Sequence, residues 1–141
     1  MNVRARVESL VRRYRTRDPF EMIQGMNAIL VYYPLDDGVR GFYQYFKRNN
    51  IIYIDERLSL HDRAFVLAHE IGHMTMHRSA NAIFMDTRTQ FNTQKYEMQA
   101  DKFAIELLVP QEIILENWQL TESQLARFTG YTEELIRLRL Q

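Results

Sequence analysis

The chain has 141 residues, of which 46% are hydrophobic and 26% are charged, and its 18 basic residues balance its 18 acidic ones. This is the size and composition of one globular domain with a buried core, and the balanced charge gives no sign of a polyanionic partner. There is no cysteine, which excludes disulfides and thiolate metal sites and leaves His, Asp and Glu as metal ligands. The first residues, MNVRARVESLVRRYRTR, lack the apolar run of a signal sequence or membrane span, so we expect a cytoplasmic protein without a membrane partner.

The first third of the chain has the pattern of two helices followed by strands. Apolar residues recur at helical spacing over residues 2–16, and DPFE is a helix-start signature that predicts a short second helix. Stretches rich in β-branched and aromatic side chains, separated by the turn-forming sequences DDG and KRNN, predict three strands near residues 28–35, 40–46 and 50–54.

The rest of the chain is mostly helical. Helical character returns at residues 61–77 and 95–108, and the polar tract between them, RSANAIFMDTRTQFNTQ, has the composition of a loop. No repeat or flexible linker marks a second domain. We therefore predict an α+β fold, with a short, mainly antiparallel three-stranded sheet packed on the helix at 61–77. The single domain would comprise N-terminal helices (1–27), a core (28–110) and a C-terminal helical hairpin (111–141).

The stretch LAHEIGHMTMH, residues 67–77, holds three of the four histidines. Residues four apart share one face of a helix, so His69 and His73 can present two imidazoles to one ion, with Glu70 beside them. Zinc suits this arrangement because it binds neutral imidazole, and a catalytic zinc keeps one position for water. Glu70 would take the proton of that water as it attacks a polarised carbonyl, as in H-E-x-x-H metallopeptidases. The same short motif also arises by chance in amphipathic helices, so the interpretation requires a third ligand.

A third ligand is available in the downstream stretch YEMQADKFAIELLVP. Glu97 can complete a three-ligand zinc set. Asp101, at helical spacing from Glu97, can accept the second ring N–H of a liganding histidine and so fix its tautomer. His77 lies about 12 Å along the helix axis from His69, so both cannot bind one ion. We predict that His77 lies near the metal without binding it.

Together, RAFVLAHEIGHMTMH and YEMQADKFAIELLVP resemble the ImmA/IrrE-type metallopeptidases of phages, integrative elements and stress-responsive bacteria. The resemblance covers roughly residues 28–110 and implies a small zincin-like fold with zinc between two helices. It implies His69, His73 and Glu97 as ligands, Glu70 as general base and Asp101 behind the ligands. In such families the substrate is typically a helix-turn-helix repressor, which we expect here to be a separate protein because the chain is too short for an added DNA-binding domain.

The substrate would need a surface on which to lie. A strand beside the active-site helix can pair with an extended peptide, as proteases commonly bind substrates. GFYQYF is the candidate strand, although its aromatic residues equally suit packing. Tyr96 and His77 are candidate stabilisers of the developing oxyanion.

Two alternatives compete with the peptidase interpretation. The tail SQLARFTGYTEELIRLRL places Ala126, Gly130 and Ile136 at the spacing of a helix-turn-helix, which suggests DNA binding. Its second helix would bring Glu133 and Glu134 toward a negatively charged groove, so we expect instead a hairpin that packs on the core or grips the substrate. The other alternative is a DNA- or protein-binding regulatory module with a structural zinc site, which has no use for a general base.

Overall fold

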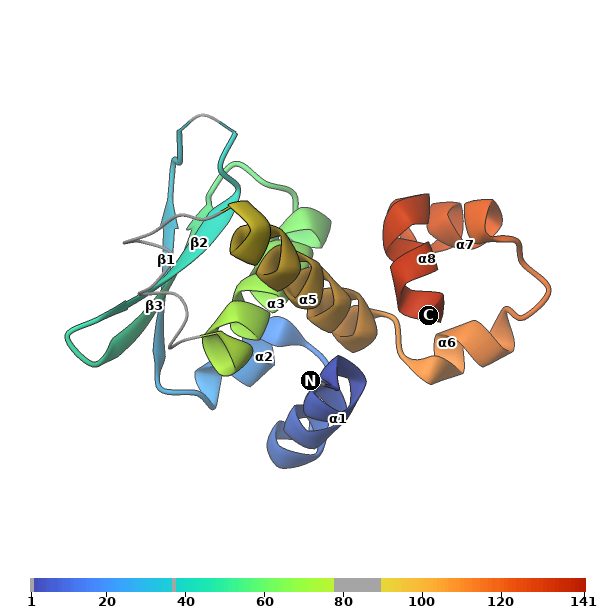
Figure 1. Cartoon of the computed structure of the whole chain (residues 1–141), viewed down its shortest axis with the longest axis horizontal. Coiled ribbons are helices and arrows are strands. Elements are labelled where there is room, and N and C mark those ends of the chain that lie inside the picture. The colour runs from blue at the N-terminus through green and yellow to red at the C-terminus, as the bar shows by residue number, and fades with distance from the viewer. Residues whose placement is uncertain (1, 37, 78–89) are drawn as a thin grey trace.

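The structure, a computed structural model, describes residues 2–36, 38–77 and 90–141, with side chains described outside 90–93. The helices are α1 (Val3–Tyr14), α2 (Pro19–Gln24), α3 (Leu60–Met76), α5 (Gln90–Leu108), α6 (Gln111–Glu116), α7 (Glu122–Thr129) and α8 (Glu133–Leu140). The strands are β1 (Ala28–Tyr33), β2 (Gly41–Phe46) and β3 (Asn49–Asp55). Figure 1 shows the sheet at one end of the molecule and α6, α7 and α8 at the other, with α3 and α5 between them.

The sheet has three strands in the order β1-β3-β2. β2 and β3 form an antiparallel hairpin, whose two-residue turn has positive φ at both Lys47 and Arg48, as a type I′ turn requires. β1 pairs in parallel with β3. The predicted α+β class and three strands are confirmed, but the sheet is mixed rather than mainly antiparallel. β3 is the most completely buried strand, with Ile52 and Ile54 fully buried, and it takes the central position between β1, to which it is parallel, and β2, to which it is antiparallel.

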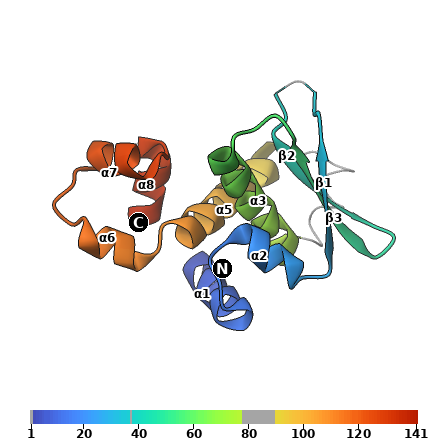
Figure 2. The ribbon, with the colours of Figure 1, turned by 180° about the vertical axis from the view of Figure 1, so that it is seen from behind.

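The core lies on two sides of α3: α3 packs against β2 and β3 of the sheet and against α5, and α3 and α5 lie side by side (Figures 1 and 2). α1 covers α5, and α2 packs against α3. The largest side chains buried here come from every layer: Val7, Met22, Ile52, Ile54, Leu67, Ile71, Phe103 and Leu107. α3 and α5 are therefore held by one continuous apolar core, which fixes the position of each relative to the other.

The predicted helices differ from the structure mainly at their ends. α1 ends at Tyr14, followed by Arg15 in the left-handed conformation. α5 begins at Gln90, so the loop predicted over 78–94 was wrong for 90–94, and residues 78–89 lie outside the described residues. A polar helix end that faces solvent resembles a loop in composition, which explains this error; Gln94 and Lys95 are exposed.

The segment 111–141, predicted as a helical hairpin, holds three helices, of which α7 and α8 form the C-terminal hairpin and are joined at Gly130 with a left-handed φ of 81°. It has a small core of its own, centred on Leu125, Ala126 and Ile136. In the segment between α6 and α7, the Trp118 side chain is 79% exposed. None of the described helices is long and apolar enough to span a bilayer.

Candidate metal centre

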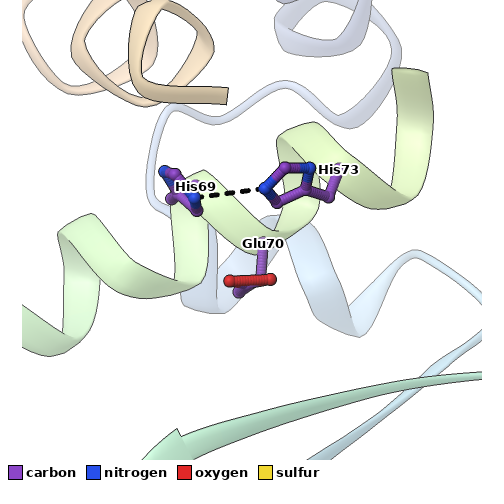
Figure 3. A group of neighbouring side chains, drawn as sticks. All are labelled: His69, Glu70 and His73. Carbon is purple, nitrogen blue, oxygen red and sulfur yellow. Dashed lines mark hydrogen bonds between the residues drawn. The ribbon is translucent and has the colours of Figure 1, made fainter. Parts of the chain in front are cut away.

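The H-E-x-x-H segment lies in the second half of α3. Ser59 caps this helix, its hydroxyl accepting a hydrogen bond from the Asp62 backbone N–H. Figure 3 shows the rings of His69 and His73 on one side of α3 and the Glu70 carboxylate on another. The four-residue spacing thus brings the two imidazoles together, as the sequence predicts.

Glu97 of α5 faces both imidazoles. One carboxylate oxygen, Oε2, lies 3.0 Å from His69 Nε2, and the other, Oε1, lies 2.9 Å from His73 Nε2. The two Nε2 atoms are 3.2 Å apart. Ligands that each lie about 2.0–2.1 Å from a tetrahedral zinc are separated by about 3.3 Å, so these spacings match those of a zinc ligand set.

The donor set also fits a cation for an electrostatic reason. Two nitrogen lone pairs at this distance repel each other unless a proton or a metal ion lies between them. Burial lowers the pKa of His69, but hydrogen bonds to Asp101 and Glu97 outweigh it and raise that pKa to about 10. Burial likewise raises the pKa of Glu97, but hydrogen bonds from His69 and His73 hold it well below its ordinary value. The site therefore stabilises positive charge at the place where the imidazoles meet.

Asp101, one turn after Glu97 on α5, contacts the far side of His69. Its Oδ1 lies 2.8 Å from His69 Nδ1. With Nδ1–H donating to this carboxylate, Nε2 is the nitrogen left for a metal. The structure thus places Asp101 where the sequence analysis expects it.

Glu70 is only 6% exposed and lies between α3 and the sheet. Burial is the main cause that raises the pKa of its carboxyl. Its carboxylate and the nitrogens of His69 and His73 all lie within 4.8 Å of one another. Gly41, the first residue of β2, lies over this point: a Cβ built there would be 2.5 Å from Val66 Cγ1 and 3.8 Å from Glu70 Cγ. The start of the edge strand β2 therefore borders the candidate site.

His77 lies behind His73. Its Nδ1 is 3.0 Å from His73 Nδ1, and its Nε2 is 2.7 Å from Oε1 of Gln99. Burial is the largest cause that lowers the pKa of His77. Its ring packs on that of Tyr96, with centroids 4.4 Å apart. His77 thus lies near the site and turns away from Glu97, while Tyr96 packs against it.

The sequence analysis did not identify Gln99 or Gly41 as part of the site. Gln99 lies two positions after Glu97, a spacing that on a helix points it in a different direction. Gly41 comes from a strand that no motif connects to α3. No local pattern signals either residue, because each acts through a contact between elements distant in sequence.

Comparison with known proteins agrees with this geometry. Residues 27–141 match the model of a peptidase family described as the IrrE N-terminal-like domain. The chain is 37% identical to uncharacterized immunity region protein 2 of Bacillus phage phi105, over 97% of this chain and 88% of that protein. It is 26% identical to metallopeptidase ImmA of Bacillus subtilis (strain 168), over 81% of this chain and 67% of that protein. Because the family model spans residues 27–141, most of the sequence, the chain belongs to the IrrE N-terminal-like family of peptidases.

Proposed function

We propose that this protein is a zinc-dependent endopeptidase that cleaves a helix-turn-helix transcriptional repressor of a phage or mobile element. The observation that supports it most directly is the meeting of His69, His73 and Glu97 beside the buried Glu70. A metallopeptidase of this family needs a protein substrate, and the phage relative takes its name from an immunity region. A repressor is the kind of protein that maintains phage immunity.

The residues divide the chemistry between them. Zinc held by His69, His73 and Glu97 would supply Lewis acidity, which polarises the scissile carbonyl and acidifies water. Glu70 accepts the proton of the attacking water and then delivers it to the leaving amine. Asp101 holds the ring of His69 from behind. A carboxylate oxygen of Glu70 lies within 4.8 Å of a ring nitrogen of each histidine, close enough to receive a proton from a water at the position that the imidazoles face.

The substrate would lie along β2. Among the strands that the structure describes, β2 is at the edge of the sheet, so its outer backbone groups face no other described strand, and an extended peptide can pair with them. Because Gly41 brings the start of β2 against α3 at Val66 and Glu70, a peptide paired there would pass the general base.

The test is cleavage of the repressor encoded by the same genetic element, followed by mass spectrometry of the fragments. Glu70→Gln should bind zinc as the parent does but produce no fragments, because an amide cannot accept the proton. Glu133→Gln makes the same chemical change at an exposed site on α8 and should cleave normally. Cleavage by Glu70→Gln would exclude this mechanism, and loss of zinc together with cleavage would make Glu70 structural.

A further inference from the structure

We propose that α6 of one copy of this chain docks into a groove of a second copy, lined by Arg6 and Arg13 of α1. The inference is independent of the metal site and of the proposed activity. It starts from α6, which has no buried residue although it contains Ile113, Ile114 and Leu115. Among the elements that the structure describes, none packs extensively against α6, which lies at the end of the molecule far from the sheet (Figures 1 and 2).

The surface of α6 is both apolar and acidic. The helix has six residues, fewer than two turns, and helices this short depend on packing rather than on helix propensity. The side chains of Leu115 and Trp118 are 62% and 79% exposed. Glu112 and Glu116 are exposed beside them, and neither carboxylate forms an ion pair with another described residue. A surface that is apolar and basic would therefore complement α6.

The chain carries a groove of this kind beside α1. Its volume is about 440 Å³, and it is lined by α1, by the segment before β1, by β3 and by the last turn of α3. Several of its apolar side chains are only half-buried: Leu10, Tyr14, Met26 and Met76. Methionine adapts its shape to the group that packs on it, which suits a surface that receives another molecule.

The two arginines of the groove have no acidic partner within the described part of the chain. Both Arg6 and Arg13 are exposed, and Arg13 stacks on the ring of Tyr14, which also lines the groove. Arg4 of the same helix differs, because it pairs with the buried Glu106. The groove therefore presents two uncompensated positive charges beside an apolar lining.

The two surfaces match in charge and in spacing. Arg6 and Arg13 are seven residues apart, which is about 10 Å along α1. Glu112 and Glu116 are four residues apart, about 6 Å along α6. The long arginine side chains span the difference, so each guanidinium can pair with one carboxylate while Leu115 packs on the apolar lining. One helix in a groove buries a small interface, so the association should be weak and should decrease with salt.

Sedimentation equilibrium of the full chain between about 1 µM and about 1 mM tests the association, because weak protein contacts lie in this range. The apparent mass should rise above that of the monomer with concentration. Arg6→Glu combined with Arg13→Glu should weaken association by about 10-fold or more, because it brings like charges together. Glu112→Lys combined with Glu116→Lys should do the same.

Two single variants are the controls. Arg12→Glu reverses a charge at an exposed position of α1 that does not line the groove, and Glu133→Lys does so at an exposed position of α8. Both should associate as the parent does. Circular dichroism spectra of all variants should match that of the parent, since every substituted side chain is exposed.

The decisive measurement mixes the two double variants. Each alone should be monomeric, since like charges meet in its own contact. In the mixture, the acidic α6 of the variant with the reversed groove meets the intact arginines of the other variant, so association should return. A misfolded variant could not produce this recovery.

Three results would overturn the proposal. One is a parent chain that stays monomeric up to about 1 mM, and another is a mixture that stays monomeric although the parent associates. The third is a monomeric parent in which Arg6→Glu with Arg13→Glu slows cleavage of the repressor, which would assign the groove to the substrate instead of a second copy.

Discussion

His69 on α3 and His77, which follows the last residue of that helix, differ in what their nitrogens face. His69 turns Nε2 toward Glu97, whereas His77 turns Nδ1 toward His73 and Nε2 toward Gln99. Among the described residues, neither nitrogen of His77 contacts a carboxylate. The geometry therefore divides the histidines into two that face the metal position and one that orients a neighbour.

This division predicts unequal effects of two alanine substitutions on zinc affinity. His69→Ala removes a ligand and should nearly abolish binding. His77→Ala removes only a hydrogen-bond partner of His73 and should lower affinity by no more than about 10–100-fold. Chelator competition on both variants gives the comparison directly. Equal losses would show that His77 is a ligand.

The site residues that the sequence indicates are those marked by a spacing within one helix. His69, Glu70 and His73 follow from their spacing within α3, and Glu97 and Asp101 from spacing within α5 together with the need for a third ligand. Gln99 depends on where His77 of a different helix lies, and no spacing rule carries that information. Residues defined by contacts between helices need the fold.

At the scale of elements, the site depends on how closely α3 and α5 approach. Gly72 lies between His69 and His73 in the sequence and faces α5, where a Cβ would lie 3.1 Å from Cβ and Cγ of Phe103. Phe103 is fully buried in the core and has little room to yield. The absence of a side chain at this position sets the distance across which Glu97 reaches the imidazoles.

Gly72→Val should therefore affect both stability and metal binding. The added methyl groups would overpack the interface and cost about 1–3 kcal/mol of unfolding free energy. They would also move Glu97 away from the histidines and weaken zinc binding. Urea unfolding and chelator competition measure the two effects. Met98→Val introduces the same side chain on the exposed face of α5 and should change neither the unfolding free energy nor the zinc affinity by much. Parental zinc affinity in Gly72→Val would show that the distance between α3 and α5 does not control metal binding.

The sheet shows which features of an element are readable from sequence. The strands and the hairpin turn follow from composition and periodicity, and each was predicted within a few residues. The pairing of β1 with β3 was not, because strand order depends on which strand the core buries most completely. The acidic start of α8 can likewise be read from the sequence, and Glu133 and Glu134 are exposed in the structure. Their negative charge argues against DNA binding by the C-terminal hairpin.

At the scale of the whole molecule, a buried ion cluster joins the two ends of the chain. Glu106 of α5, 2% exposed, pairs with Arg4 of α1, Lys102 of α5 and Arg139 of α8. Arg139 also donates to the Val109 carbonyl. Several hydrogen bonds thus surround one carboxylate, and they attach the C-terminal hairpin to the helices that hold the site.

This cluster predicts a pH-dependent stability. Burial raises the pKa of Glu106, but hydrogen bonds from Arg4 and Lys102 outweigh it, and the pKa lies below its ordinary value of 4.5. A carboxylate with a lowered pKa stabilises the fold fully above its unfolded pKa, and this contribution is lost as the pH falls through the folded pKa. Glu106→Gln should cost about 3–5 kcal/mol near neutral pH, because it leaves the cations without their anion.

Thermal melts followed by circular dichroism check this prediction. The difference in melting temperature between parent and Glu106→Gln should be largest near neutral pH and should narrow as the solution is acidified below about pH 4. Glu122→Gln, which breaks the exposed pair with Arg137, is the control and should cost at most about 1 kcal/mol. A constant difference at every pH would show that packing, rather than charge, is responsible.

The exposed position of Trp118 has a spectroscopic consequence. It is the single tryptophan of the chain, and its indole already lies in water at the C-terminal end of the molecule. Its fluorescence therefore barely responds to the unfolding of a core that it does not enter. The same indole is a sensitive reporter of anything that covers the C-terminal helices, since its emission shifts to the blue when water is excluded. Trp118 fluorescence can therefore report the binding of a partner to the C-terminal helices, whereas it should change little when the core unfolds.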